Sequence, residues 1–86
     1  MSHHAAKRFW RAFAELPEEV QKLARENFGL LKSNPQHPSL HFKRVGKYWS
    51  VRIGNSFRAL GENSPAGVVW FWIGPHEEYE RLIRQA

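Results

Sequence analysis

The sequence contains neither cysteine nor aspartate among its 86 residues. Without cysteine the chain forms no disulfide bond and no thiolate metal site, which favours a reducing compartment such as the cytoplasm. The first residues lack the apolar core of a signal peptide, and no apolar run approaches the length of a membrane-spanning segment. We therefore expect a cytoplasmic protein without a membrane partner, and we assign it no cofactor.

A metal site is also not expected. His37 and His41 have the i, i+4 spacing of two ligands on a helix, but Pro38 lies between them and argues against a helix there. No cysteine or aspartate is present to complete a ligand set, so the sequence predicts no zinc site. The pair His3–His4 resembles the remnant of a tag and is assigned no function.

Acidic residues are missing from a long central stretch of the chain. Between Asn27 and Gly61 there is none, although the whole chain carries eight, and its net charge is +5. The same stretch contains six basic residues: Lys32, Lys43, Arg44, Lys47, Arg52 and Arg58. Such an arrangement predicts one positive surface, which suits an anionic partner such as nucleic acid. A basic protein without a specific anionic partner is the alternative.

The length indicates one small domain spanning residues 1–86. Two helices are expected first, at residues 5–14 and 17–33, and Pro35 ends the second one. The apolar period then changes from helical to alternating. Four strands are predicted, at residues 40–45, 48–53, 57–62 and 68–73, with a closing helix at 76–86. Short connections make neighbouring strands antiparallel, so the fold class is α+β: two N-terminal helices packed on a four-stranded antiparallel sheet, with a short C-terminal helix.

Alternation along the strands predicts two different faces of this sheet. The face against the N-terminal helices would carry Trp49, Val51, Ile53, Phe57, Ala59, Val69, Phe71 and Ile73. The opposite face would carry Tyr48, Ser50, Arg52, Arg58, Trp70 and Trp72. Guanidinium groups suit phosphate oxygens and aromatic rings stack on bases, so this second face is a candidate RNA-binding surface. In the alternative, the closing helix covers both tryptophans and the arginines pair with Glu77, Glu78 or Glu80.

The segments LPEEVQKLARENFGLLKSNPQHPSLHFKRV, FRAL and IGPHEEYERLI, in this order, resemble the RelE/ParE superfamily of bacterial type II toxins over nearly the whole chain. The resemblance implies one of two activities. RelE-like members are ribosome-dependent endoribonucleases that cut messenger RNA without a metal, using the substrate's own 2′-hydroxyl. ParE-like members inhibit DNA gyrase. Both kinds are neutralised by a cognate antitoxin, and a third possibility is a degenerate member that only binds its antitoxin.

The resemblance assigns roles to several candidate residues, the open sheet face supplies the tryptophans, and the nuclease reading is preferred. Arg58 matches the arginine that contacts the scissile phosphate, and Arg52 would be a second clamp on it. His76 would act as general acid or base, and Tyr79 would orient the hydroxyl or stack on a base. The remaining candidates, expected to hold the nucleic acid, are Lys43, Arg44, Lys47, Trp70 and Trp72. Two positions where strong nucleases tend to be basic carry Ser50 and Pro75 instead.

Overall fold

The computed structural model describes residues 2–85, so the expected ends of the domain at Met1 and Ala86 lie outside it. Its helices are α1 (Lys7–Ala14), α2 (Glu18–Ser33), the short 3₁₀ helix η1 (Pro38–Leu40) and α3 (His76–Arg84). Its strands are β1 (His3–Ala5), β2 (Lys43–Val45), β3 (Tyr48–Ile53), β4 (Phe57–Ser64) and β5 (Gly67–Pro75). The α+β class is confirmed, as is the order of two helices, four antiparallel strands and a closing helix, to which the structure adds β1 and η1.

The strand count is the first correction. The sheet has the order β1-β5-β4-β3-β2, in which β2 to β5 form the expected antiparallel meander and β1 adds a fifth, parallel strand beside β5. Backbone hydrogen bonds hold β1 in place, from Val68 N to Ser2 O and from Ala6 N to Trp70 O, both at 2.9 Å. Three residues are too few to show a period, so nothing in the sequence marks them as a strand.

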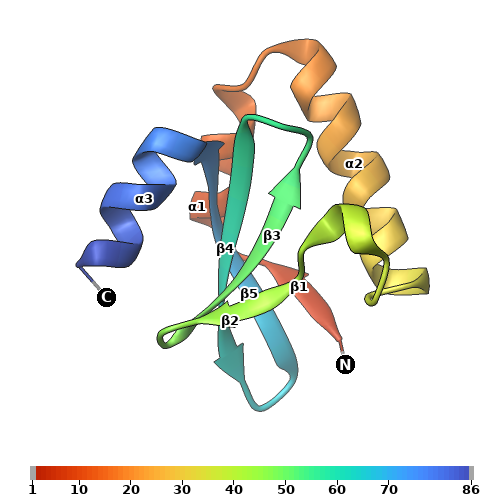
Figure 1. The fold of residues 1–86 in the computed structure, drawn as a ribbon, viewed down its shortest axis with the longest axis vertical. Helices are drawn as coiled ribbons and strands as arrows, with labels where there is room; N and C mark the ends of the chain where they lie inside the picture. The colour runs from red at the N-terminus through yellow and green to blue at the C-terminus, as the bar shows by residue number, and fades with distance from the viewer. Residues whose placement is uncertain (1, 86) are drawn as a thin grey trace.

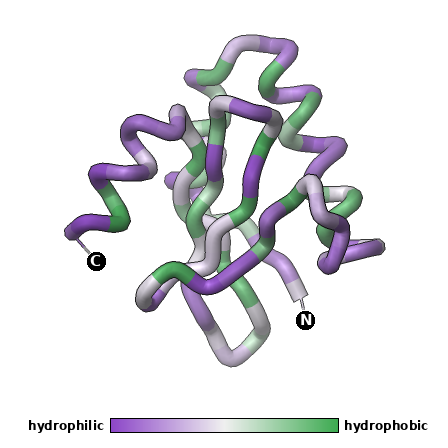
Figure 2. The backbone as a smooth tube through the Cα atoms, viewed as in Figure 1, coloured by the Kyte–Doolittle hydropathy of each residue, from purple (hydrophilic) through white to green (hydrophobic). Residues whose placement is uncertain are grey.

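Helices lie on both sides of the sheet (Figure 1). α1 and α2 pack on one face and enclose the main core with the strands, while α3 lies against the other face through its contacts with β4 and β5. Figure 2 shows that apolar residues concentrate in the strands and that α3 is mostly hydrophilic. None of the helices within residues 2–85 has both the length and the apolar character needed to cross a lipid bilayer.

A β-bulge in β5 overturns part of the expected face assignment. The ladder shifts between Leu60, which pairs with Trp72, and Gly61, which pairs with Trp70, so that Phe71 is the extra residue. An extra residue moves the alternation by one position, and side chains before the bulge therefore point to the opposite side from the one expected. Val68, Trp70 and Ile73 all belong to the core under α1 and α2.

The predicted set for the helix-covered face is therefore right in β3 and β4 and only partly right in β5. Core residues and their partly buried neighbours include six members of that set: Trp49, Val51, Ile53, Phe57, Ala59 and Ile73. Phe71 instead lies 5.3 Å from the ring of Tyr48, on the opposite face, and Val69 pairs with Glu62 in the same row as Tyr48. The placement of Trp70 on that opposite face was wrong.

Gly61 and His3 determine how Trp70 packs, and the sequence pattern connects neither of them with it. A Cβ atom at Gly61 would lie 3.0 Å from its indole and 2.6 Å from Val68, so glycine makes room for the ring on β4. Its Nε1 donates a hydrogen bond to His3 Nδ1 at 3.1 Å. Burial lowers the pKa of His3, which favours the neutral ring that accepts this bond. His3 thus has a structural role, as the partner of a buried indole.

Candidate functional site

Arg52 and Arg58 stand opposite each other on neighbouring strands. They are register partners in the β3–β4 ladder and project from the face that α1 and α2 do not cover. In the described part of the chain neither guanidinium forms an ion pair with a carboxylate. The alternative in which they pair with Glu77, Glu78 or Glu80 is therefore wrong.

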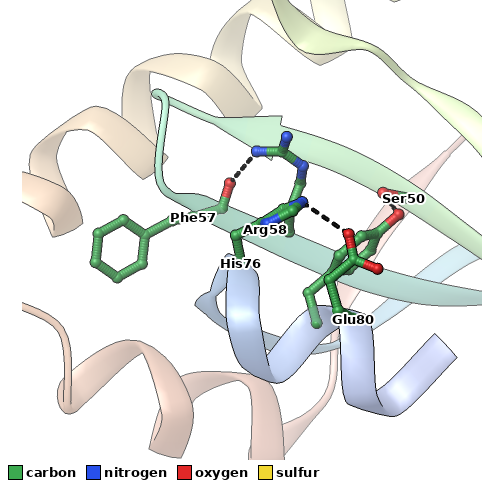
Figure 3. A network of polar contacts seen from close by, with 6 residues as sticks. Ser50, Phe57, Arg58, His76 and Glu80 are labelled. Carbon is green, nitrogen blue, oxygen red and sulfur yellow. Dashed lines mark hydrogen bonds and ion pairs between the residues drawn. The ribbon is translucent and has the colours of Figure 1, made fainter. Parts of the chain in front are cut away.

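Oxygen atoms near the β3–β4 turn hold both guanidinium groups in position. Arg52 donates from Nε to Gly54 O at 2.8 Å and from Nη2 to Oδ1 of Asn55. Arg58 donates from Nη1 to Phe57 O at 2.9 Å, a bond drawn in Figure 3. Each guanidinium has five N–H donors, so these contacts orient the pair and leave donors for an anion.

The electrostatics of Arg58 favour an anionic ligand. Burial lowers the pKa of Arg58, and the neighbouring charge of Arg52 lowers it further. Both causes act against the charged form of the side chain. A phosphate bound to the two groups would replace lost hydration and offset their repulsion, and the planar fork of a guanidinium matches phosphate oxygens. The two arginines therefore form a prepared anion-binding pair.

Helix α3 brings two further candidates beside Arg58 (Figure 3). Its first residue, His76, is anchored by a hydrogen bond from its backbone N to Ser56 O at 2.8 Å. One turn later Glu80 Oε1 lies 3.2 Å from His76 Nε2. The helix therefore holds the imidazole of His76 at the edge of the sheet, close to the β3–β4 turn.

The side chain of Tyr79 is more deeply buried than contact with a substrate would require. Its side chain is 5% exposed, and its hydroxyl accepts a hydrogen bond from Oγ of Ser50 at 3.1 Å. The guanidinium of Arg58 lies 5.9 Å from the centre of its ring. Ser50 of β3 thus anchors α3 to the sheet. Tyr79 supports Arg58 and fixes the helix that carries His76.

These side chains line one cleft of about 230 Å³ between α3, the sheet and the η1–β2 segment. Its lining comprises His41, Lys43, Val45, Ser50, Arg58, His76, Tyr79, Glu80 and Ile83. The volume lies below the roughly 300–1,000 Å³ of small-molecule pockets, and it suits a phosphate group with part of one nucleotide. The cleft therefore brings together four of the residues that the nuclease hypothesis requires: Arg58, His76, Tyr79 and Lys43. Arg52 lies at the margin of the cleft, where it contacts His41.

The other nucleic-acid candidates lie outside this cleft. Arg44 stacks on Trp49, 5.2 Å from the ring centre, in the row of side chains that faces the helices. Lys47 lies over Tyr48 at the exposed end of the β2–β3 hairpin. Trp70 is 2% exposed and offers no free ring for a base, so its expected role was wrong. Trp72 is half-buried in a separate cleft between α1 and α3.

His41 is the site residue that sequence reasoning missed. It was considered only as a metal ligand, and within residues 2–85 no cluster of three acidic, histidine or cysteine side chains is close enough to hold a metal ion. The sequence around it carries no signal for the cleft, because its place depends on how the η1–β2 segment crosses β3. The structure puts it on the cleft wall, 3.5 Å from Arg52 Nη1.

A second, apolar groove of about 380 Å³ lies on the other side of the molecule, between β1, α1 and α2. Its base is aromatic, and its lining includes Phe9, Trp10, Phe13 and Phe28. Arg25 and Lys32 add positive charge to the same lining. The side chain of Trp10 is 53% exposed, which is high for so large an apolar group. An exposed apolar groove of this kind is typical of a protein–protein contact.

Three solved structures share this architecture. The RelB–RelE antitoxin–toxin complex from Methanococcus jannaschii has a TM-score of 0.69 and 17% identity, covering 92% of this chain and 96% of that one. The toxin–antitoxin complex RelBE2 from Mycobacterium tuberculosis gives 0.64 and 19%, covering 86% and 95%. A mutant of the Escherichia coli toxin RelE in the free state gives 0.65 and 12%, covering 96% and 88%. At these identities the likeness shows the fold.

The family itself is shown by the sequence comparison. No curated protein sequence matches this chain significantly. Residues 18–81, most of the chain and all of the strands of the cleft, match the family described as the ParE-like toxin domain. This match agrees with the RelE-like fold and with the clustered cleft residues. The protein is therefore a member of the ParE-like toxin domain family, within the RelE/ParE superfamily of toxins.

Proposed function

We propose that this toxin is a RelE-like, ribosome-dependent endoribonuclease that cleaves messenger RNA and thereby inhibits translation. The observation that carries the proposal is the register pair of Arg52 and Arg58, free of carboxylate partners in the described chain, in which Arg58 shares a cleft with His76 and Arg52 lies at the margin of that cleft. A protein that acts only by occupying gyrase needs no such combination of phosphate clamps and an imidazole.

The proposed reaction uses groups that the chain itself supplies and no cofactor. The 2′-hydroxyl oxygen of the substrate attacks the adjacent phosphorus, and negative charge grows on the non-bridging oxygens. Arg58 and Arg52 stabilise that charge more strongly in the transition state than in the ground state. His76 transfers a proton during the reaction. Tyr79 keeps α3 and the guanidinium of Arg58 in position.

Basic residues around the cleft would extend the contact with RNA. Lys43 lines the cleft and is suited to the next phosphate along the strand. Lys47 and Arg44 lie farther along the β2–β3 hairpin and would add attraction to messenger or ribosomal RNA. Each phosphate that such residues neutralise makes binding more sensitive to salt.

The proposal is tested with purified protein and ribosomes carrying a defined messenger RNA. We expect cleavage only in the presence of ribosomes, and we expect a 2′-deoxy nucleotide on the 5′ side of the cut to abolish it. Cleavage of the deoxy substrate would contradict the mechanism. Intact messenger RNA together with inhibited DNA supercoiling would establish the ParE-like activity instead. Absence of both effects would indicate a member that only binds its antitoxin.

We also propose that a cognate antitoxin covers the apolar groove between β1, α1 and α2. The solved relatives from Methanococcus jannaschii and Mycobacterium tuberculosis are toxin–antitoxin complexes. In this chain the groove combines an exposed Trp10 with the positive side chains of Arg25 and Lys32, which complement an acidic amphipathic segment. Aromatic anchors of this kind commonly carry a large share of binding energy.

Replacing Trp10 with glutamate is expected to weaken antitoxin binding by about 30-fold, the equivalent of roughly 2 kcal/mol. Ala14→Glu is the matched control, because it places the same charge on an exposed position of α1 outside the groove. Calorimetry with the antitoxin encoded beside the toxin measures both variants. Equal affinities for Trp10→Glu and Ala14→Glu would remove the groove as the contact site.

A further inference from the structure

The active-site cleft has two walls that carry different histidines. α3 contributes His76 and Glu80, while the η1–β2 segment contributes His41 and Lys43. Arg58 of β4 lies on the sheet between them. A phosphate held by Arg58 therefore has an imidazole on either side of it. The inference below rests on the proposed nuclease function.

His41 is held by an uncommon backbone conformation. Its φ of 44° and ψ of 43° are left-handed, and within residues 2–85 it is the only residue other than glycine with positive φ. This conformation is unfavourable for a non-glycine residue, and such strained residues cluster at functional sites. The neighbouring Leu40 is fully buried and keeps the segment in place. The backbone strain thus accompanies a side chain that lines the cleft.

The two imidazoles have opposite hydrogen-bond roles. His41 Nε2 lies 3.5 Å from Nη1 of Arg52, and since a guanidinium has only donors, this nitrogen presents its lone pair. His76 Nε2 lies 3.2 Å from Oε1 of Glu80, and since a carboxylate only accepts, this nitrogen carries a hydrogen. His41 Nε2 is therefore the acceptor in its contact with Arg52, and His76 Nε2 is the donor in its contact with Glu80.

We infer that His41 is the general base and His76 the general acid of the cleavage. His41 Nε2 takes the proton of the 2′-hydroxyl as the bond from the 2′-oxygen to phosphorus forms. The bond from phosphorus to the 5′-oxygen breaks, its electron pair stays on that oxygen, and protonated His76 supplies the proton. The products are a 2′,3′-cyclic phosphate and a 5′-hydroxyl end, so atoms and charge balance without a further reactant.

The surroundings of His41 are mainly cationic. The charged or titratable groups that face it across the cleft and beside it are Lys43 from β2, Arg52 from β3, Arg58 from β4, and His76, Tyr79 and Glu80 from α3. A bound phosphodiester adds negative charge beside the ring. That negative charge offsets the positive charge of Lys43, Arg52 and Arg58 around the proposed base.

The test is the single-turnover cleavage of ribosome-bound messenger RNA by His41→Gln across pH. Glutamine still accepts a hydrogen bond from Arg52 but does not take up a proton, so we expect the rate to fall by about 100- to 10,000-fold. The loss of rate toward low pH, which reports the base, should disappear. His4→Gln, an exposed histidine on β1 far from the cleft, is the control and should cleave at the wild-type rate.

A substrate with sulfur in place of the 5′-oxygen separates the two roles, because a thiolate leaves without a proton. This substrate should restore cleavage by His76→Gln and leave His41→Gln slow. Antitoxin binding and thermal unfolding of both variants verify that they are folded. Wild-type rate and pH dependence in His41→Gln, or its rescue by the sulfur substrate, would overturn this assignment alone. Absence of cleavage by the wild type would overturn the proposed function, and this assignment with it.

Discussion

Replacing Arg58 with alanine is expected to slow transcript cleavage by roughly 100- to 1,000-fold and to abolish growth arrest on expression. The reason is that in the proposed reaction Arg58 supplies charge and directed N–H donors to the phosphate oxygens, and its neighbours already hold it at the cleft. Arg58→Lys should recover only part of the rate, because an ammonium keeps the charge and loses the two-pronged geometry. Single-turnover cleavage on ribosomes measures both variants.

The Arg58 experiment needs a control for general loss of positive charge. Arg11→Ala serves, because Arg11 is exposed on α1 and outside the cleft, and its cleavage rate should match the wild type at equal salt. Removing one of two closely spaced cations also relieves their repulsion, so Arg58→Ala should be at least as stable as the wild type. Growth arrest by Arg58→Ala with intact transcripts would contradict the assignment of Arg58 to catalysis.

Replacing Trp70 with alanine is expected to lower the free energy of unfolding by about 3–5 kcal/mol. Trp70 is almost fully buried, contacts Phe28 and Phe42, and donates its indole N–H to His3. Alanine would leave a cavity in the core and remove the partner of His3. Since small domains are stable by only about 5–15 kcal/mol, this loss is a large share of the total and should lower the urea concentration at the unfolding midpoint markedly.

Urea unfolding followed by circular dichroism measures this effect, and Trp72→Ala is the comparison. Trp72 is half-buried, so its replacement should cost clearly less than that of Trp70. Unchanged stability of Trp70→Ala, combined with weaker RNA binding, would mean that the indole lies on the open face as the alternation suggested.

Features that depend on local pattern were readable from the sequence. The α+β class followed from the change of period after Pro35, and the meander followed from the short connections around Gly46 and Gly54. The opposition of Arg52 and Arg58 was also within reach, because a tight turn fixes the register of the two strands that it joins. The family resemblance rested on the same local segments and is confirmed.

Features that depend on contacts between distant segments required the tertiary structure. The bulge at Phe71 reverses the faces of β5 before it, because one extra residue shifts a two-residue period, and no local signal marks where that residue falls. His3 meets Trp70, 67 residues away in the chain, only when β1 joins β5. His41 meets Arg52, 11 residues away, only when η1 crosses β3. The sequence by itself thus determined the three helices, the four-stranded meander and the positive charge, but not β1 or η1. Long-range packing decided which side chains meet, because side-chain direction and burial depend on neighbours that no single segment contains.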